Sequence, residues 1–161
     1  MAYDAFVSIT SIKGESTDAQ HMGWIEVLNH ELRQRQHIYK FPDSCGGTRG
    51  CRTEFFHFVF RKEIDASTPL LYLACAQGRH IDEVVLDICK PRGHKACLMR
   101  YMFQNCMIRL VSTLGTQYHT RELVWIDFGK IQWDYVQHNR VTGLPMGHIE
   151  AGWDRQTNSI M

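Results

Sequence analysis

Apolar and polar residues alternate over several segments of the chain, and a period of two is typical of β-strands. In residues 5–12, Val7, Ile9 and Ser11 fall on one side, and Phe6, Ser8, Thr10 and Ile12 fall on the other. Residues 55–61 read Phe-Phe-His-Phe-Val-Phe-Arg, and aromatic side chains favour a pleated, half-buried surface. The pattern predicts strands at residues 5–12, 24–28, 55–61, 82–90, 98–112 and 123–137, with a short last strand near 148–153.

A single helix is expected to interrupt these strands. Ser67 or Thr68 is suited to the N-cap, and Pro69 is suited to the first helical position. Residues 70–74 place leucine and alanine at helical spacing, and Gly78 can end the helix. The expected fold is therefore mainly β, with one flanking α-helix.

The two longest predicted strands are apolar on both faces. In residues 98–112 one face shows Met99, Tyr101, Phe103 and Met107, and the other shows Leu98, Met102, Cys106, Ile108 and Leu110. In residues 123–137 one face holds Leu123, Trp125, Ile131, Trp133 and Tyr135, and the other holds Val124, Ile126, Phe128 and Val136. In an antiparallel sheet with one solvent-exposed face, apolar and polar residues alternate regularly along each strand. Because these strands are apolar on both faces, another element is expected to cover the outer face. The helix can cover part of it, and a neighbouring subunit is the simplest cover for the rest.

The segment from about residue 31 to residue 52 has no sustained period and contains a proline and three glycines. Structureless loops longer than about 12–15 residues are usually functional or disordered. The segment is also basic, because Arg33, Arg35, Lys40, Arg49 and Arg52 outnumber Glu31 and Asp43. It is either a solvated mobile loop or an arm that docks on another subunit.

Length and charge limit the classes of protein that the chain can belong to. Its 161 residues suit one domain, and 18 basic against 17 acidic residues give a formal net charge of +1, which argues against a nucleic-acid partner. Residues 1–5 lack the features of a secretory signal, and the longest uncharged stretch, 66–78, is too short and too polar to span a membrane. We expect a chain that is made in the cytoplasm and does not insert into membranes. If it is exported, we expect no cleaved signal peptide.

Signals for catalysis are weak. The sequence has no G-x-S-x-G nucleophile motif, and a charged turn explains the group His80, Asp82 and Glu83. We expect no catalytic residues and no cofactor.

Signals for a metal site are also weak. The two candidate ligand groups are Cys45, Cys51 and His57, and Cys89, His94 and Cys97. Structural zinc usually requires cysteine pairs separated by about two to four residues, and the chain has no C-x-x-C pair. We expect Cys75, Cys89, Cys97 and Cys106 to be reduced thiols that pack as small apolar side chains.

Short motifs follow one another along nearly the whole chain. The first are residues 1–6 (Met-Ala-Tyr-Asp-Ala-Phe), 13–16 (Lys-Gly-Glu-Ser), His21 and 24–28 (Trp-Ile-Glu-Val-Leu). Residues 58–65 (Phe-x-Phe-x-Lys-x-Ile-Asp), 67–69 (Ser-Thr-Pro) and 74–81 (Ala-Cys-Ala-x-Gly-x-His-Ile) come next. The last are residues 111–113 (Val-Ser-Thr), 129–135 (Gly-Lys-Ile-x-Trp-x-Tyr) and 151–154 (Ala-Gly-Trp-Asp). Together these motifs resemble the haemolysin-coregulated protein (Hcp) family.

The resemblance implies an antiparallel β-barrel with one flanking α-helix, similar to a contractile phage tail-tube protein. Members of the family form hexameric rings that stack as the inner tube of the bacterial type VI secretion system. The implied partners are other copies of the chain, the sheath, spike and baseplate of the machine, and effector proteins held in the lumen. The implied location is the bacterial cytoplasm during assembly, followed by secretion to the extracellular space or a target cell. Two alternatives stay open: a free secreted ring that carries effectors, and a phage-type tail tube.

The sequence departs from the family in residues 31–52, where many relatives are rich in glycine and serine. The family places an extended loop at the ring face here, so the candidate contacts within or between rings are Glu31, Arg33, Arg35, Tyr39, Lys40, Arg49 and Arg52. Residues 115–121 also lack the family's glycine-rich run. With the sequence ending at Met161, we expect no enzymatic extension of the kind found in fused tube-effector proteins.

Cys45 and Cys51 flank a flexible, glycine-rich span. Our hypothesis is that both thiols stay reduced in the cell and form a disulfide after export, within one loop or between rings. The cytoplasm keeps such thiols reduced, whereas extracellular conditions favour disulfides.

Overall fold

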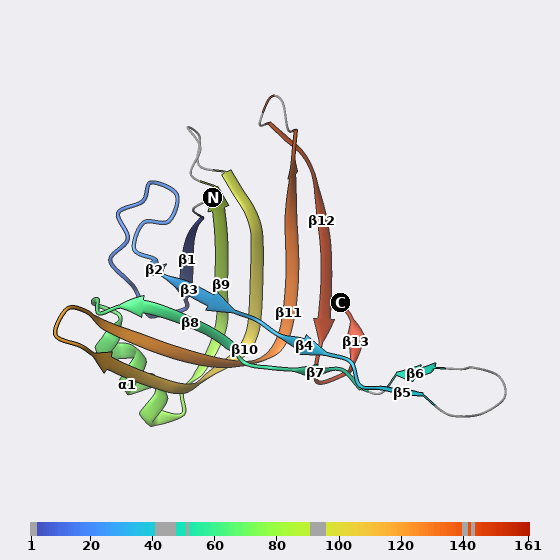
Figure 1. Cartoon of the computed structure of the whole chain (residues 1–161), viewed down its shortest axis with the longest axis horizontal. Helices are drawn as coiled ribbons and strands as arrows, with labels where there is room; N and C mark the ends of the chain where they lie inside the picture. The colour runs from blue at the N-terminus through green and yellow to red at the C-terminus, as the bar shows by residue number, and fades with distance from the viewer. Residues whose placement is uncertain (1–2, 41–47, 51, 91–95, 140–141, 143) are drawn as a thin grey trace.

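A long β-hairpin, formed by β10 (Ala96–Gly115) and β11 (Thr120–His138), runs through the whole molecule (Figure 1). The computed structural model describes residues 3–40, 48–50, 52–90, 96–139, 142 and 144–161. The two strands pair from Met99 opposite Tyr135 to Gly115 opposite Thr120. The predicted strands at 98–112 and 123–137 are therefore confirmed, and both are longer than expected.

Both strands of the hairpin bend along their length (Figure 1), and their ladder is interrupted at Asn105 and Gly129, between the pairs Gln104–Lys130 and Cys106–Phe128. Asn105 has a φ of 55°, in the left-handed region that asparagine tolerates better than most residues. A Cβ atom on Gly129 would lie 3.0 Å from the Cβ of Asn105, so glycine is the residue that fits most easily here. The bend divides the hairpin into an upright part and a lower part.

The bend changes which side chains face the core. Phe103 and Cys106 are both fully buried, although the sequence predicts them on opposite faces. Phe128 and Ile131 on β11 are likewise both buried. A strict period of two holds only while the backbone stays extended, and the left-handed residue at the bend interrupts it. The predicted faces are therefore wrong across the bend. They are wrong again at the bulge between Ile108 and Leu110, which puts Leu110 opposite Trp125 rather than on the face of Ile108.

Strand β11 changes its neighbour at the bend. Along Arg121–Ile126 it pairs with β8 (Phe58–Glu63), and along Lys130–His138 it pairs with β12 (Pro145–Asp154). On the other side of the hairpin, β10 pairs with β9 (His80–Lys90), which pairs with β1 (Asp4–Ile9). All these pairings are antiparallel.

Two short consecutive strands join the ends of this sheet. Strand β2 (Ile25–Val27) pairs with β1, and β3 (Asn29–Glu31) pairs with β8. Between them, the Leu28 amide donates a hydrogen bond of 2.8 Å to the Arg61 carbonyl oxygen. Within the described residues the ladders do not close completely, yet the sheet wraps around one core. The expected mainly β, barrel-like architecture is confirmed.

The core fills the barrel with side chains from every wall. Its fully buried members include Val7, Ile25, Phe58, Phe60, Leu71, Val84, Leu86, Phe103, Val124 and Ile126. The rings of Phe58 and Phe103 stack with centroids 4.7 Å apart. Contiguous burial of this kind is the main force that favours the folded chain.

The predicted helix is confirmed as α1 (Thr68–Gln77), which packs on β10. It buries Leu71 and Ala74 and ends at Gly78, whose φ of 58° is left-handed. Ser67 does not cap the helix with its side chain, because its hydroxyl donates to Asp65 instead. No helix among the described residues has the length and apolar character needed to cross a membrane.

A buried ion pair joins β8 to the hairpin, and a hydrogen bond to the same carboxylate joins the start of the helix to it. The Lys62 ammonium lies 2.8 Å from the Glu122 carboxylate, and both side chains have no exposed surface. Thr68 also donates to Glu122 at 2.8 Å. Buried charges are tolerated only when they are paired and hydrogen-bonded, so the three groups depend on one another.

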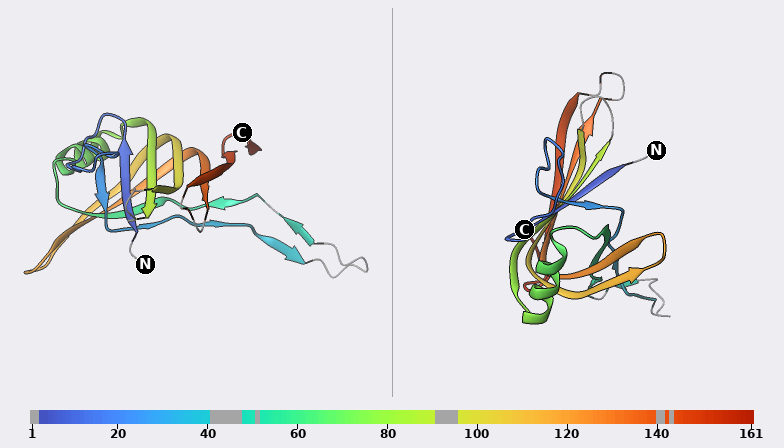
Figure 2. Two further views of the ribbon diagram at one scale, coloured as in Figure 1. Left: turned by 90° about the horizontal axis from the view of Figure 1, so that it is seen from above. Right: turned by 90° about the vertical axis from the view of Figure 1, so that its left-hand side faces the viewer.

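An extended arm leaves the barrel opposite the tip of the hairpin (Figures 1 and 2). Its root is β4 (Gln34–Arg35) paired with β7 (Glu54–Phe55). Farther out, β5 (Ile38–Lys40) pairs with β6 (Thr48–Gly50). Strand β13 (Ser159–Ile160) pairs with the last residues of β12 near the C-terminus.

We predict that Lys62→Met destabilises the chain by about 3–5 kcal/mol, because Glu122 is left buried without its cation. The free energy of unfolding, measured with guanidinium chloride, checks this. The double substitution Lys62→Met with Glu122→Leu is expected to recover part of the loss. A loss below about 1 kcal/mol for the single change would show that the pair is not buried as described.

Candidate assembly surface

The root of the arm is held by charged side chains around one aromatic ring. The guanidinium groups of Arg33 and Arg35 lie 5.2 and 5.8 Å from the centroid of the Phe56 ring, close enough for cation–π attraction. Arg35 also donates to Glu54 at 2.9 Å, and His37 lies 3.1 Å from the same carboxylate. Arg33 pairs with Glu31 at 2.6 Å.

These contacts change the electrostatics of the root. Hydrogen bonds from His37 and then from Arg35 hold the pKa of Glu54 below its ordinary value. The carboxylate therefore stabilises the root at neutral pH and loses this role as the pH falls through its lowered pKa. The basic excess predicted for residues 31–52 is partly neutralised within the chain, since Glu54 lies just outside that segment.

The structure places the sequence-predicted interface residues in different settings. Glu31, Arg33 and Arg35 meet at the root, and Arg52 donates to the carbonyl oxygen of Arg155. Tyr39, Lys40 and Arg49 belong to the β5–β6 ladder, where Tyr39 pairs with Arg49. Cys45 and Cys51 lie outside the described residues. Glu54, His37 and Phe56 were not singled out from the sequence.

The outer edge of β12 is a second candidate surface. Strand β13 covers only its last residues, through Trp153 opposite Ile160 and Asp154 opposite Ser159. Along the rest of β12, within the described residues, no strand pairs on the side away from β11. Exposed apolar side chains gather on and beside this edge: Leu144, Met146, Ile149, Ile160 and Met161. An open, apolar sheet edge is a template for pairing with another chain.

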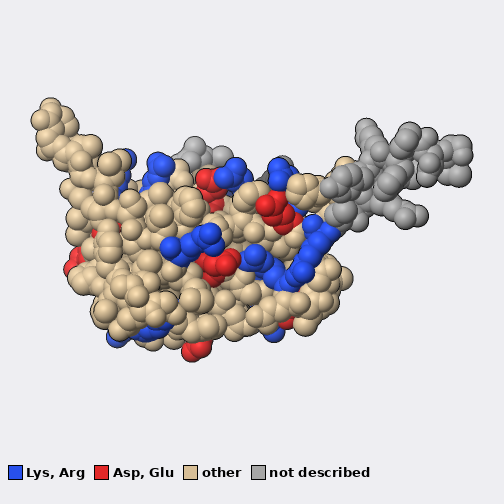
Figure 3. All heavy atoms as spheres, turned by 90° about the horizontal axis from the view of Figure 1, so that it is seen from below, with Lys and Arg blue, Asp and Glu red and all other residues tan. Residues whose placement is uncertain are grey.

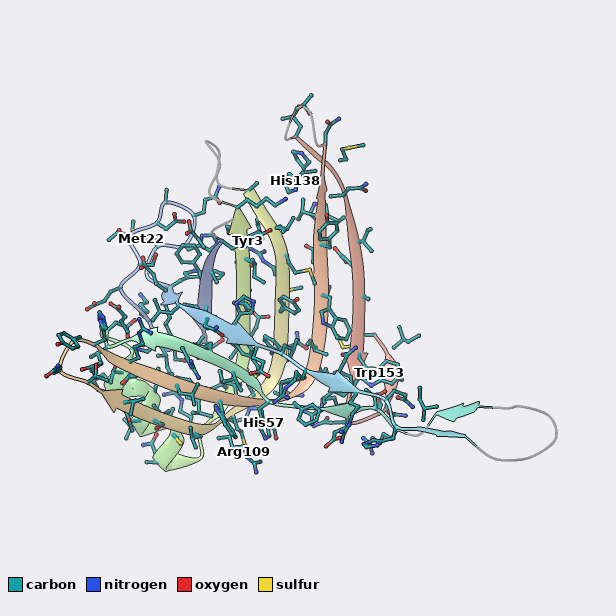
Figure 4. The ribbon with its side chains drawn as sticks, in the orientation of Figure 1. Tyr3, Met22, His57, Arg109, His138 and Trp153 are labelled. Carbon is teal, nitrogen blue, oxygen red and sulfur yellow. The ribbon has the colours of Figure 1, made fainter. Side chains whose placement is uncertain are left out.

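A groove of about 600 Å³ lies where the arm meets the foot of β12. The Arg155 guanidinium lies 4.8 Å from the centroid of the Phe128 ring and donates to Asp127 at 3.0 Å. Burial alone would raise the pKa of Asp127, but Arg155 outweighs it and the pKa is lowered. Trp153, labelled in Figure 4, also lines the groove together with Phe55 of β7, and its indole N–H is buried without an acceptor among the described residues. A buried donor of this kind can be satisfied by a group from a second chain.

Charged side chains follow the lower face of the molecule toward the arm. Figure 3 shows lysine and arginine in a row there, with aspartate and glutamate among them. A surface with charges of both signs favours recognition of a complementary protein surface over binding of a uniformly charged polymer.

Among the described residues, one group could hold a metal ion. Ligand atoms of Asp134, His148 and Glu150 lie within 4.8 Å of one another on β11 and β12. His148 and Glu150 are exposed, and exposed acidic groups often cluster without a metal. His57, a candidate ligand from the sequence, instead stacks on Trp125 with its ring 5.8 Å away.

A comparison with known proteins identifies the family. The family model described as "Type VI secretion system effector, Hcp" matches residues 6–135. The chain belongs to the Hcp family. It is 30% identical to the protein hcp1 of Pseudomonas aeruginosa strain PAO1 over 98% of each chain.

Solved structures agree with this assignment. The crystal structure of Hcp1 from Salmonella typhimurium is 29% identical, covers 100% of both chains and superposes with a TM-score of 0.79. A type VI secretion system effector from Yersinia pestis is also 29% identical, over 94% of this chain and 99% of its own, with a TM-score of 0.76. Another type six secretion system protein, 24% identical over 99% of this chain and 100% of its own, reaches a TM-score of 0.91 and supports the fold. The recognition of the Hcp family from sequence motifs is confirmed.

We predict that Arg35→Glu raises the pKa of Glu54, because a carboxylate replaces the cation beside it. An NMR titration of the Glu54 carboxyl group checks this. Lys13→Glu, an equal charge change on an exposed residue of another loop, serves as the control and is expected to leave Glu54 unchanged. Equal titration of Glu54 in both variants would mean that Arg35 does not contact it in solution.

Proposed function

We propose that this chain is a tube subunit of a type VI secretion system, which closes into hexameric rings that stack into a tube and carry effectors. Membership of the Hcp family supports the machine and the subunit's place in it. The open apolar edge of β12 is the observation on this chain that supports assembly.

The geometry of the sheet suits a ring. The contact we propose joins the β12 edge of one copy to a different surface of the next, and such a heterologous contact closes into a ring when the rotation allows. Burial of Met146, Ile149 and Ile160 would then remove apolar surface from water. The unpaired edge, which would favour aggregation of an isolated copy, becomes the contact between neighbouring copies of the ring.

The arm suits contacts made beyond one ring. It projects away from the barrel, and its root is braced by Glu54, Arg33 and Arg35 (Figure 2). A two-stranded ribbon has no core of its own and gains order by packing on a partner. We propose that it rests on the adjacent ring, using Tyr39, Lys40, Arg49 and Arg52 among its contacts.

The proposed partners follow from this role. The tube would contact a sheath, a spike and a baseplate, and its lumen would hold effector proteins. The protein would assemble in the cytoplasm and be secreted with the tube. The proposed role is structural, without catalysis, which accords with the family's character as a secreted structural protein.

The oligomeric mass tests the proposed seam. We expect light scattering coupled to size exclusion to give six times 18.8 kDa for the native chain. Ile149→Lys is expected to weaken association at least tenfold, about 1.4 kcal/mol, because a lysine would enter an apolar contact. Leu73→Lys is the matched control, since Leu73 is an exposed apolar residue on α1, far from β12 in Figure 1. Equal masses for both variants would contradict a seam at β12.

Replacing both Arg33 and Arg35 with Glu is expected to shorten or abolish stacked tubes without unfolding the barrel. The two arginines brace the arm through Phe56 and Glu54, so their reversal loosens the arm rather than the core. Electron microscopy measures tube length, and circular dichroism checks the fold. Tubes of unchanged length would exclude a role for the braced arm in stacking.

A further inference from the structure

Two cysteines face each other across the upright part of the sheet. Cys89 on β9 and Cys97 on β10 are direct partners in the antiparallel ladder, and both are reduced thiols. Directly opposed residues in such a ladder have Cα atoms about 4.5–5.5 Å apart. A disulfide requires about 4.4–6.8 Å, so this backbone separation is compatible with a bond between them.

The two thiols also contact each other. Cys89 hydrogen-bonds to the Cys97 sulfur, which lowers the pKa of the Cys97 thiol, and Arg100 adds to this effect. These influences outweigh burial and the carboxylates of Asp87 and Asp134. Cys106 contrasts with this pair, because burial raises its pKa to about 12. A thiolate is the reactive form of cysteine, so Cys97 is the better nucleophile.

The surroundings of the pair are rigid. The Sγ atom of Cys89 lies 4.0 Å from Nε2 of the buried His21, which lies 3.0 Å from the Asp87 carboxylate. Arg100 donates two hydrogen bonds of 2.7 Å to the same carboxylate. Cys89 is completely buried, whereas Cys97 is only partly buried. An oxidant from solvent therefore meets Cys97 first.

We propose that Cys97 and Cys89 form a redox-active dithiol, with Cys97 as the attacking thiol and Cys89 as the resolving thiol. The oxidant is a low-molecular-weight disulfide of the glutathione class. The Cys97 thiolate attacks one sulfur of glutathione disulfide, forms a mixed disulfide and releases one glutathione thiolate. Cys89 then attacks the Cys97 sulfur, transfers its proton to the departing thiolate and releases the second glutathione. Two protein thiols and one glutathione disulfide become one protein disulfide and two glutathione thiols.

The dithiol chemistry of Cys89 and Cys97 does not depend on the proposed function. The stage at which the pair would be oxidised does rest on the proposed function, because it follows from secretion of the subunit. A subunit assembled in the reducing cytoplasm would keep both thiols, and a subunit delivered outside would meet oxidising conditions. The bond would then join β9 to β10 at the end of their ladder. The Cys45–Cys51 bridge expected from the sequence is a separate hypothesis.

Peptide mapping of oxidised protein tests the pair. Full-length protein with Cys45→Ser and Cys51→Ser is equilibrated in glutathione buffers of rising oxidised fraction, then alkylated and digested. Trypsin cleaves after Arg92 and Lys95, which separates the peptides that carry Cys89 and Cys97. We expect a linked pair of these two peptides, with the loss of two hydrogen atoms. Cys75, which is partly buried on α1, is the matched control and is expected to stay alkylated.

Single substitutions assign the roles. In Cys89→Ser, Cys97 is expected to accumulate as a glutathione adduct; in Cys97→Ser, the buried Cys89 is expected to stay reduced. If either variant fails to fold, the order of products in the parent protein decides: a glutathione adduct on Cys97 is expected to form before the Cys89–Cys97 bridge. Two results would overturn the proposal. One is that Cys89 and Cys97 are alkylated as fully as Cys75 in oxidising buffer, and the other is that Cys97 forms a bridge to another cysteine. Neither result depends on whether the protein forms rings.

Discussion

The bend of the central hairpin is the constraint on which the rest of the structure depends. Asn105 and Gly129 turn β10 and β11 together, so one continuous hairpin contributes to two differently oriented parts of the sheet. Below the bend, β11 pairs with β8 and encloses the core; above it, β11 pairs with β12 and extends the sheet. Because of the bend, these two neighbours of β11 belong to differently oriented parts of the sheet.

The bend also explains why the fold leaves surfaces open. The sheet wraps around its phenylalanine core, and α1 is held to β11 by the hydrogen bond from Thr68 to Glu122, the buried partner of Lys62. The upper extension ends at β12, whose outer edge is largely unpaired within the described residues. Above the bend, the hairpin thus contributes Phe103 and Ile131 to the core and also leads to this open edge. The arm, braced at Phe56, adds a third surface that does not take part in the core.

Most elements of the fold could be predicted from sequence because their signals are local. Alternation located the long strands, and Pro69 and Gly78 bounded the helix. The faces of β10 and β11 were predicted incorrectly across the bend, because the left-handed conformation of Asn105 leaves no mark in an alternating pattern. Residues 31–52 showed no period partly because the strands there are short: β4 has two residues, both exposed, and β5 and β6 have three each.

The candidate surfaces were less predictable because they depend on contacts between distant residues. Arg35 could be singled out by its charge, but its partner Glu54 lies 19 residues away. Cys89 and Cys97 were expected only as packed thiols, since their pairing follows from the register of β9 and β10. The exposed edge of β12 likewise appears only once the order of the strands is known. Family motifs located the protein in its class, but they did not identify these surfaces.

Electron cryo-microscopy of the assembled protein would show what each copy does with the edge of β12. We expect a six-membered ring in which a neighbouring copy covers Met146 and Ile149 and continues the sheet from β12. A ring in which this edge faces solvent, with its apolar side chains exposed, would contradict this expectation.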